Sequence, residues 1–307
     1  MKITSMLGGA ALALSICASA VAKEGGDQYP NGAENWFAGA LPPAGDYFLN
    51  YFGYYTGELR NASGDKANVG GKTPSVDAWF DALRWVHVTD TKLFGADWGW
   101  HVIVPVVNQK IDFVPLGGSR SATGIGDVTI NPIVLGWHLS PELHVTAGLD
   151  INLPTGRYDR NDLRTSIGAN YWSFEPVLAV SWLRSDGWEA SAKLMVNFKT
   201  KNTDTDYRSG DDVHVDYLVG KAFGPWGVGV SGYYLKQFTE DKLNGATVAA
   251  APGVWGEGRK GQVFAAGPSI RYSGLGKTHL IAQWQHEMAV ENRFGGDKFW
   301  LKAIVPF

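Results

Sequence analysis

Polar and charged side chains recur at every second position within several otherwise apolar segments. In the segment Leu143–Pro154, for example, Asp150 and Asn152 alternate with Leu149 and Ile151. Because successive side chains of a β-strand point to opposite faces, the polar members of each segment share one face. The candidate solute-binding residues on this polar face are Asp150, Asn152, Glu175, Glu189, Lys193, Asn197, Lys199, Asp216, Gln285, Glu287 and Lys302.

This polar face mixes carboxylates with ammonium groups. Opposite charges that face each other across a narrow interior can pair and fix its shape, or they can form a ring that selects solutes. Structural pairing is favoured, because side chains can largely fill a small lumen. With both signs present, we expect at most weak ion selectivity.

The chain shows no pattern of catalytic or metal-binding residues. The Gly-x-Ser-x-Gly and His-Glu-x-x-His patterns are absent from the sequence, and Cys17 is the only cysteine. We therefore predict no catalytic residue, no metal site and no cofactor. A Ser–His pair across strands, such as Ser173 or Ser191 with His144, leaves a lipid hydrolase as a minor alternative.

Period-two alternation covers most of the chain beyond residue 45 and predicts antiparallel strands. The faces of Trp172–Trp182 and Trp188–Lys199 carry aromatic residues near their ends, as lipid-facing strands do. We predict twelve strands, with ten to fourteen acceptable, at 46–58, 75–89, 97–109, 125–138, 142–154, 166–183, 187–201, 211–223, 226–238, 260–273, 277–290 and 297–307.

The connections between these strands alternate in length. Those after strands 2, 4, 6, 8 and 10 are mostly short, such as Leu139–Pro141 and Gly224–Pro225, whereas those after strands 1, 3, 5, 7 and 9 are longer and polar. An even strand number with this alternation is typical of an outer-membrane barrel whose ends both lie on the periplasmic side. A secreted β-sandwich or lipocalin-like barrel is the soluble alternative.

The first 22 residues predict export. Lys2 precedes an apolar run at Met6–Ile16, and Ala20-Val21-Ala22 fits a cleavage site. No later segment is long and apolar enough for a membrane helix, so a membrane location requires a closed β-barrel. We therefore divide the chain into a signal peptide at 1–22, an amino-terminal segment at 23–45 and a transmembrane, up-and-down antiparallel β-barrel at 46–307.

The last strand ends on an aromatic residue. Phe299, Leu301, Ala303, Val305 and Phe307 alternate with Trp300, Lys302, Ile304 and Pro306 up to the final position. This arrangement resembles the carboxyl-terminal assembly signal of outer-membrane barrels. We expect Phe307 to serve as that signal, with the barrel assembly machinery, outer-membrane lipids and lipopolysaccharide as partners.

Composition excludes other classes of protein. The 307 residues are 45% hydrophobic and 19% charged, with 39 Gly, 14 Phe, 13 Trp, 12 Tyr and a net charge of −3. So many aromatic residues at low net charge argue against disorder. The chain also lacks the basic surplus that neutralises phosphates, so we predict no nucleic-acid partner.

The segment 23–45 is rich in Gly, Pro and Asn but contains Trp36, Phe37 and Leu41. A disordered periplasmic tail has no need of this apolar group. We therefore predict that the segment enters the barrel and narrows or plugs it.

Several blocks of the mature chain resemble one known family. These are Asn31–Glu34 with Ala38–Tyr47, Gly124–Asp127 with Leu135–His138, Pro154–Tyr158, Asn170–Trp172 and Asn202–Gly210. Together they resemble the bacterial "MetA-pathway of phenol degradation" family of outer-membrane transporters. The resemblance implies an outer-membrane barrel that imports hydrophobic aromatic compounds.

The sequence therefore predicts a monomeric outer-membrane channel for passive uptake of small hydrophobic or aromatic solutes. Binding in such a channel must be weak, because a solute held too tightly does not leave. The alternative is a structural or adhesive barrel with a closed lumen.

Overall fold

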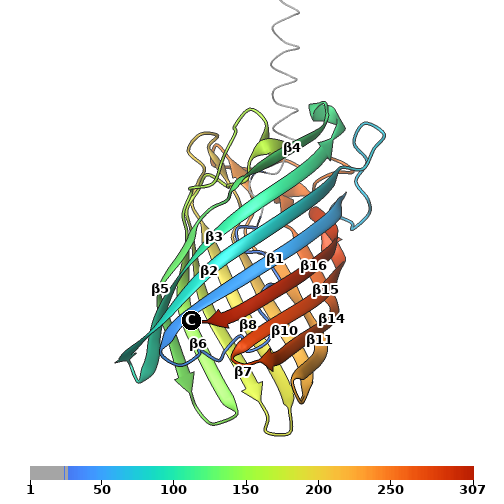
Figure 1. The fold of residues 1–307 in the computed structure, drawn as a ribbon. Helices are drawn as coiled ribbons and strands as arrows, with labels where there is room; N and C mark the ends of the chain where they lie inside the picture. The colour runs from blue at the N-terminus through green and yellow to red at the C-terminus, as the bar shows by residue number, and fades with distance from the viewer. Residues whose placement is uncertain (1–23, 25–26) are drawn as a thin grey trace, which may run out of the picture.

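The computed structural model describes residue 24 and residues 27–307, so the predicted signal peptide 1–22 lies outside the described residues. Within the described chain, antiparallel strands form one closed barrel with twelve positions around its wall (Figure 1). The barrel strands are β1 (Gly45–Arg60), β2 (Ser75–Leu93), β3 (Ala96–Phe113), β4 (Gly118–Ile125), β5 (Thr129–His138), β6 (Leu143–Asn152), β7 (Ser173–Leu183), β8 (Trp188–Lys199), β10 (Asp212–Phe223), β11 (Trp226–Gln237), β14 (Gln262–Leu275), β15 (Thr278–Glu291) and β16 (Arg293–Pro306). The predicted all-β transmembrane-type barrel is confirmed.

Two pairings complete the ring. β1 pairs along its length with both β2 and β16, which joins the first strand to the last. β4 and β5 occupy one position because both pair with β3, β4 toward the end Phe113 and β5 toward the end Ala96. Closure pairs the long strands of the wall on both sides, as a lipid environment requires, whereas the short β4 at the loop end pairs with β3 alone.

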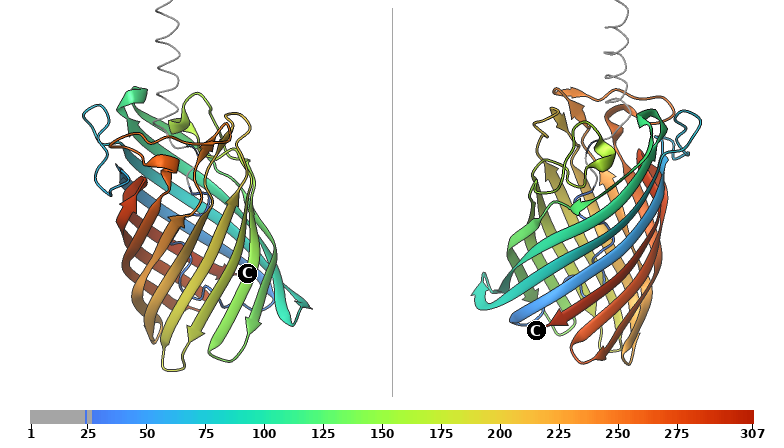
Figure 2. Two further views of the ribbon diagram at one scale, coloured as in Figure 1. Left: turned by 180° about the vertical axis from the view of Figure 1, so that it is seen from behind. Right: turned by 45° about the horizontal axis from the view of Figure 1, so that its top comes forward.

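The two ends of the barrel differ. The long connections 61–74, 153–172, 200–211 and 238–261 gather at one end, drawn at the top in Figure 1 and seen from two further sides in Figure 2. They contain a small sheet of β9 (Tyr207–Arg208), β12 (Lys242–Leu243) and β13 (Ala246–Thr247), and two short 3₁₀ turns, Leu163–Thr165 and Glu257–Arg259. A third such turn, Val114–Leu116, joins β3 to β4 at the same end. No helix among the described residues is long and apolar enough to cross a membrane.

Some predicted strand bounds were wrong. The sixth predicted strand, which is β7 in the structure, begins at Ser173 instead of 166, because Asn170 has φ of 59° and the preceding residues form a loop. The predicted loop after the third strand is instead a β3–β4 hairpin that extends the wall. At the opposite end β2 and β3 are longer than predicted, and Phe94 and Gly95, both with positive φ, make a two-residue turn.

The two faces of the wall differ in chemistry as the alternation requires. In β16, Leu301 is 60% exposed on the outer face, whereas its neighbour Trp300 is 1% exposed inside. Aromatic residues such as Trp182 and Trp188 are exposed on the outer face of β7 and β8. Three buried apolar clusters, in contrast, lie within the barrel and include residues of the segment before β1.

Candidate functional site

The segment 27–44 lies inside the barrel and connects many of its strands (Figures 1 and 2). Glu24 accepts hydrogen bonds from Asn202 and Thr205, which belong to a long connection at the loop end. β1 then begins at the opposite end, beside the carboxyl terminus. The prediction that the barrel begins and ends on the same side holds for the start of β1 and the end of β16. The segment before β1, however, extends through the lumen to the loop end.

Asp216 on β10 binds residues 29–34 of the segment. Its carboxylate accepts hydrogen bonds from the Tyr29 hydroxyl (2.6 Å), the Gly32 amide (2.8 Å) and the Glu34 amide (3.0 Å). Hydrogen bonds to a charged acceptor are stronger than neutral ones. A single buried carboxylate therefore fixes the backbone over residues 29–34.

Cations and amides of β15 and β16 hold the other side of the same stretch. The Lys302 ammonium donates to the carbonyl of Ala33 (2.6 Å), and the Lys298 ammonium donates to that of Asn31 (3.0 Å). The amide groups of Gln283 and Gln285 both donate to the carbonyl of Gly32. The backbone of the segment is thus satisfied by side chains of the wall instead of by a β-ladder.

Trp36 and Phe37 are packed against Arg271 of β14. The Arg271 guanidinium lies 4.5 Å from the Trp36 ring centroid and 4.3 Å from that of Phe37. The Trp36 indole donates to Ser269 Oγ (2.9 Å), and the Phe37 amide donates to Glu189 Oε1 (2.6 Å). Arg271 in turn pairs with Glu189, so the aromatic pair sits on an ion pair of the wall.

Leu41 ends the buried part of the segment. It packs with Val86 and Val88 of β2 and Val134 of β5. Just before it, the Gly39 amide donates to Ser181 Oγ and the Gly39 carbonyl accepts from Thr146 Oγ1. A Cβ at position 39 would lie 2.5 Å from the Ser181 backbone, so this close approach requires glycine.

Glu34 joins the segment to cations and a hydroxyl of the wall. Its carboxylate accepts hydrogen bonds from Arg84 on β2 and from the Tyr51 hydroxyl on β1 (2.8 Å). Burial acts to raise the pKa of Glu34, but the cations Arg84, Lys193 and Lys302 outweigh burial and lower this pKa to about 2. Glu34 is therefore ionised and bound to the wall at neutral pH.

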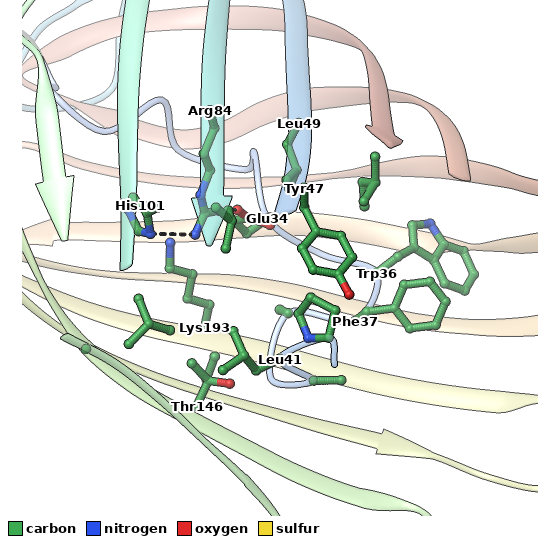
Figure 3. A pocket seen from close by; sticks show the side chains of 18 of the residues that line it. Glu34, Trp36, Phe37, Leu41, Tyr47, Leu49, Arg84, His101, Thr146 and Lys193 are labelled. Carbon is green, nitrogen blue, oxygen red and sulfur yellow. Dashed lines mark hydrogen bonds and ion pairs between the residues drawn. The ribbon is translucent and has the colours of Figure 1, made fainter. Parts of the chain in front are cut away.

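Arg84 extends this cluster across the lumen. Its guanidinium lies 2.9 Å from His101 Nδ1, and His101 Nε2 lies 3.0 Å from Asp150 Oδ1 on β6 (Figure 3). Asp150 also accepts a hydrogen bond from Asn131 (2.8 Å). We call Glu34, Arg84, His101, Asp150 and Lys193 the central cluster.

The predicted polar face is buried inside the wall. Asp216, Glu189, Gln285 and Lys302 contact the amino-terminal segment through hydrogen bonds, and Lys193 contacts the Tyr29 ring. Their relative placement could not be read from the sequence. The remaining residues pair with neighbours on the wall and its loops, as in Asn152–Ser173, Glu175–Asn197, Lys199–Asp212 and Glu287–Tyr233.

Phe307, the predicted assembly signal, lies outside the lumen. It is strongly exposed, and its amide donates to the carbonyl of Asp46 at the start of β1 (3.0 Å). Its role in assembly stays a prediction.

Two cavities bounded by described residues remain beside the segment. The first, of about 500 Å³, lies toward the turn end among residues such as Phe37, Leu41, Leu49 and Val134. The second, of about 470 Å³, lies toward the loop end among residues such as Phe80, Ile103 and Val107. Both are lined by all five members of the central cluster, which therefore stands where the cavities meet.

Sequence reasoning missed an apolar stripe on the inner wall. Inward-facing residues of β2 and β3 line the second cavity, namely Val76, Ala78, Phe80, Ala82, Ile103, Val107 and Ile111. The outer face of β2 instead carries Asp77 and Asp81 beside Trp79. Tyr54 and Asn50 of β1 donate hydrogen bonds to these two carboxylates. The sequence did contain one signal for the orientation of β2. Trp79 and Trp85 lie six residues apart and therefore on one face of the strand, and interfacial aromatic residues mark the outer face.

The described residues contain no group of three or more His, Cys, Asp or Glu side chains placed to hold a metal ion. The central cluster instead places hydrogen-bond donors and charged groups where the two mainly apolar cavities meet.

One solved structure has the same fold, and two others are less similar. The COG4313 outer membrane channel from Pseudomonas putida F1 matches with a TM-score of 0.72 at 15% identity, covering 92% of this chain and all of the other. The β domain of the Bordetella autotransporter BrkA has a TM-score of 0.49 at 10% identity, covering 86% of this chain and 100% of its own. The Pseudomonas putida toluene transporter TodX has a TM-score of 0.46 at 10% identity, covering 93% and 94%.

No curated protein is significantly similar to the chain in sequence. A family model, in contrast, matches residues 56–303 and therefore most of the barrel. The chain accordingly belongs to the family described as "Putative MetA-pathway of phenol degradation", and it has the fold of an outer-membrane channel.

Proposed function

We propose that the protein is a passive channel of the outer membrane for small hydrophobic or aromatic compounds. The observation that carries this proposal is the pair of mainly apolar cavities that meet at the central cluster. Cavities of this size suit small organic molecules. The description of the family, which refers to phenol degradation, supports the same class of solute.

Toward the loop end the path follows the inner faces of β2 and β3, and toward the turn end it passes β1 and β5. Apolar residues such as Phe80 and Ile103 line it above the central cluster, and Leu49 and Val134 line it below. A solute moving along this stripe makes weak contacts at several places, which allows it to enter and to leave. Such diffusion requires no energy coupling.

The amino-terminal segment narrows this path and acts as its plug. Trp36 and Phe37 pack against β10, β14 and β15, on the other side of the lumen from the stripe, and Leu41 packs against Val86 and Val88 of β2. Passage past the central cluster then depends on whether Glu34 and its neighbours move.

The same proposal covers location and assembly. Residues 1–22 direct export, Phe307 is recognised by the barrel assembly machinery, and the monomeric barrel then lies among outer-membrane lipids and lipopolysaccharide. The exposed aromatic residues on the outer wall, such as Trp182, support this location.

Conductance across a planar bilayer tests the proposal. The purified chain is compared with a variant that lacks residues 27–44, each with and without a monoaromatic solute such as phenol. Discrete steps that an aromatic solute reduces are expected for the full chain, and larger steps are expected for the deletion variant. Steps that are insensitive to aromatics in both proteins would contradict the proposed solute class.

The dense hydrogen bonding of residues 29–39 to the wall favours a second candidate, a structural or adhesive barrel with a closed lumen. Heat-modifiable migration that shows a folded barrel, together with no conductance and no solute uptake into liposomes, would support this candidate. A lipid hydrolase is disfavoured because the sequence contains neither the Gly-x-Ser-x-Gly nor the His-Glu-x-x-His pattern. Release of fatty acid by the purified protein would overturn that judgement.

A further inference from the structure

We propose that Lys193 binds the carboxylate of a small aromatic monocarboxylate whose ring lies in the adjoining apolar cavity. This inference rests on the proposed channel function and narrows its solute class. It makes Lys193 a specificity-determining residue of the path.

The Lys193 side chain is 7% exposed, yet its ammonium makes no hydrogen bond or ion pair within 4 Å with any described residue. The ammonium lies over the Tyr29 ring, 4.6 Å from the ring centroid. A buried charge without a hydrogen-bonding partner is costly. The three N–H donors of Lys193 are therefore available to a guest that carries an acceptor.

The carboxylates near Lys193 are occupied by other donors. Glu34 accepts from Arg84 and Tyr51, and Asp150 lies against His101 and accepts from Asn131. Asp216 is likewise occupied by the backbone and the tyrosine hydroxyl of the amino-terminal segment. The carboxylates are thus held by other donors, and the Lys193 ammonium is left without a hydrogen bond among the described residues.

A second buried donor supports the same chemistry. The Nε atom of Arg84 has no hydrogen-bond partner among the described residues. Figure 3 shows the Lys193 side chain pointing toward the Arg84–His101 hydrogen bond. Two strands therefore supply donors without hydrogen-bond partners beside the cavities, the ammonium of Lys193 and the fully buried Nε of Arg84, and such donors favour an acceptor-rich guest over a cationic one.

The surroundings of Lys193 define the rest of the guest. Lys193 lines both cavities, and in the first cavity it shares the lining with Val177, Ala179 and Leu41. A carboxylate at the ammonium would thus place an attached ring among apolar side chains. Burial of the ring and the charge-assisted hydrogen bond would act together.

The charges of the site limit the guest to one negative charge. The carboxylates of Glu34, Asp150 and Asp216 balance the cations Arg84, Lys193 and Lys302. A monoanion adds one uncompensated charge, whereas a dianion adds two within a poorly solvated space. We therefore expect weak binding of monocarboxylates and weaker binding of aromatic dicarboxylates.

Calorimetric titration of the full-length mature barrel in detergent micelles tests this inference. The probes are benzoate, the neutral analogue benzyl alcohol and the dianion phthalate. Lys193→Met removes the ammonium and keeps a side chain of similar length, and Lys236→Met removes an exposed lysine from the outer face of β11 as a matched control. We expect Lys193→Met to weaken benzoate binding about tenfold or more, since a charge-assisted hydrogen bond is lost, and to leave benzyl alcohol unchanged.

Lys193→Arg guards against a folding artefact. It keeps the positive charge and should keep the preference for benzoate, and heat-modifiable migration shows whether each variant is folded. Equal binding of benzoate and benzyl alcohol by the wild-type protein would overturn the inference, as would unchanged benzoate binding by folded Lys193→Met. If conductance steps respond to neutral aromatics while either of these results holds, the channel function stands and only the carboxylate site fails. A barrel that binds benzoate through Lys193 but shows no conductance would instead refute the channel function.

Discussion

Replacing Trp36 by alanine should release the amino-terminal segment without unfolding the barrel. Trp36 is 3% exposed, its indole donates to Ser269, and its ring lies against Arg271. The substitution removes these contacts from the segment only. The strands keep their antiparallel ladders, because no strand pairing involves residue 36.

The size of the effect follows from the burial of the ring. Truncation of a buried Trp to Ala costs about 3–5 kcal/mol in protein cores. Since about 1.4 kcal/mol corresponds to a tenfold change in an equilibrium constant, docking of the segment should weaken roughly a hundredfold to several-thousandfold. The lower figure applies if water enters the space and hydrates Arg271 and Ser269.

Hydrogen exchange measured by mass spectrometry reports this docking. The amides of Gly32, Phe37 and Gly39 donate to Asp216, Glu189 and Ser181, so their exchange depends on release of the segment. Peptides that cover residues 32–39 should exchange faster by a factor within the range above, and peptides of β10 and β14 should not change.

Trp79→Ala is the matched control, because Trp79 is 49% exposed on the outer face and touches no residue of the segment. It should leave exchange of residues 32–39 unaltered. Unchanged exchange of these residues in folded Trp36→Ala would refute the reasoning that the indole holds the segment in the lumen.

Three further predictions concern the same contacts. The pKa of Glu34 is lowered, so its ion pair with Arg84 contributes stability above pH 4.5 that is lost as the pH falls toward about 2. Hydrogen exchange of the segment's amides, corrected for the intrinsic effect of pH, should therefore rise as the pH falls over that interval. A flat profile would show that Glu34 does not hold the segment. Gly220→Ala places a Cβ 2.5 Å from the Trp36 ring and should displace the ring. Hydrogen exchange of residues 32–39 should rise, but less than in Trp36→Ala. Exchange equal to that of the wild type would mean that the ring accommodates the methyl group. Deletion of Phe307 should lower the fraction of heat-modifiable, folded barrel in cell membranes severalfold, and an unchanged fraction would remove Phe307 as the assembly signal.

Much of the wall could be predicted from residue alternation. The segments around Asp150, Glu175 and Lys193 have one polar and one apolar face, so the pleat alone groups the buried residues together. Strand number followed from the same period and from the turn residues between segments. The bounds were less certain where a strand continues into a hairpin, as at the end of β3.

The inner path could not be predicted in this way. In β2 the apolar residues Val76, Ala78, Phe80 and Ala82 face inward, whereas Asp77 and Asp81 face outward beside Trp79, so the two faces are not divided into apolar outside and polar inside. Alternation states only that two sets of side chains lie on opposite faces. Which set lies inside depends on the barrel that all the strands close together.

The sequence by itself therefore determined that this chain is an outer-membrane-type barrel with a mixed polar interior and an aromatic exterior. Only the tertiary structure decided that Glu34, Arg84, His101, Asp150 and Lys193 meet. These residues come from the amino-terminal segment and four separate strands, far apart in sequence. Their contact depends on strand register and on the course of the segment through the lumen, and neither property leaves a local pattern in the chain.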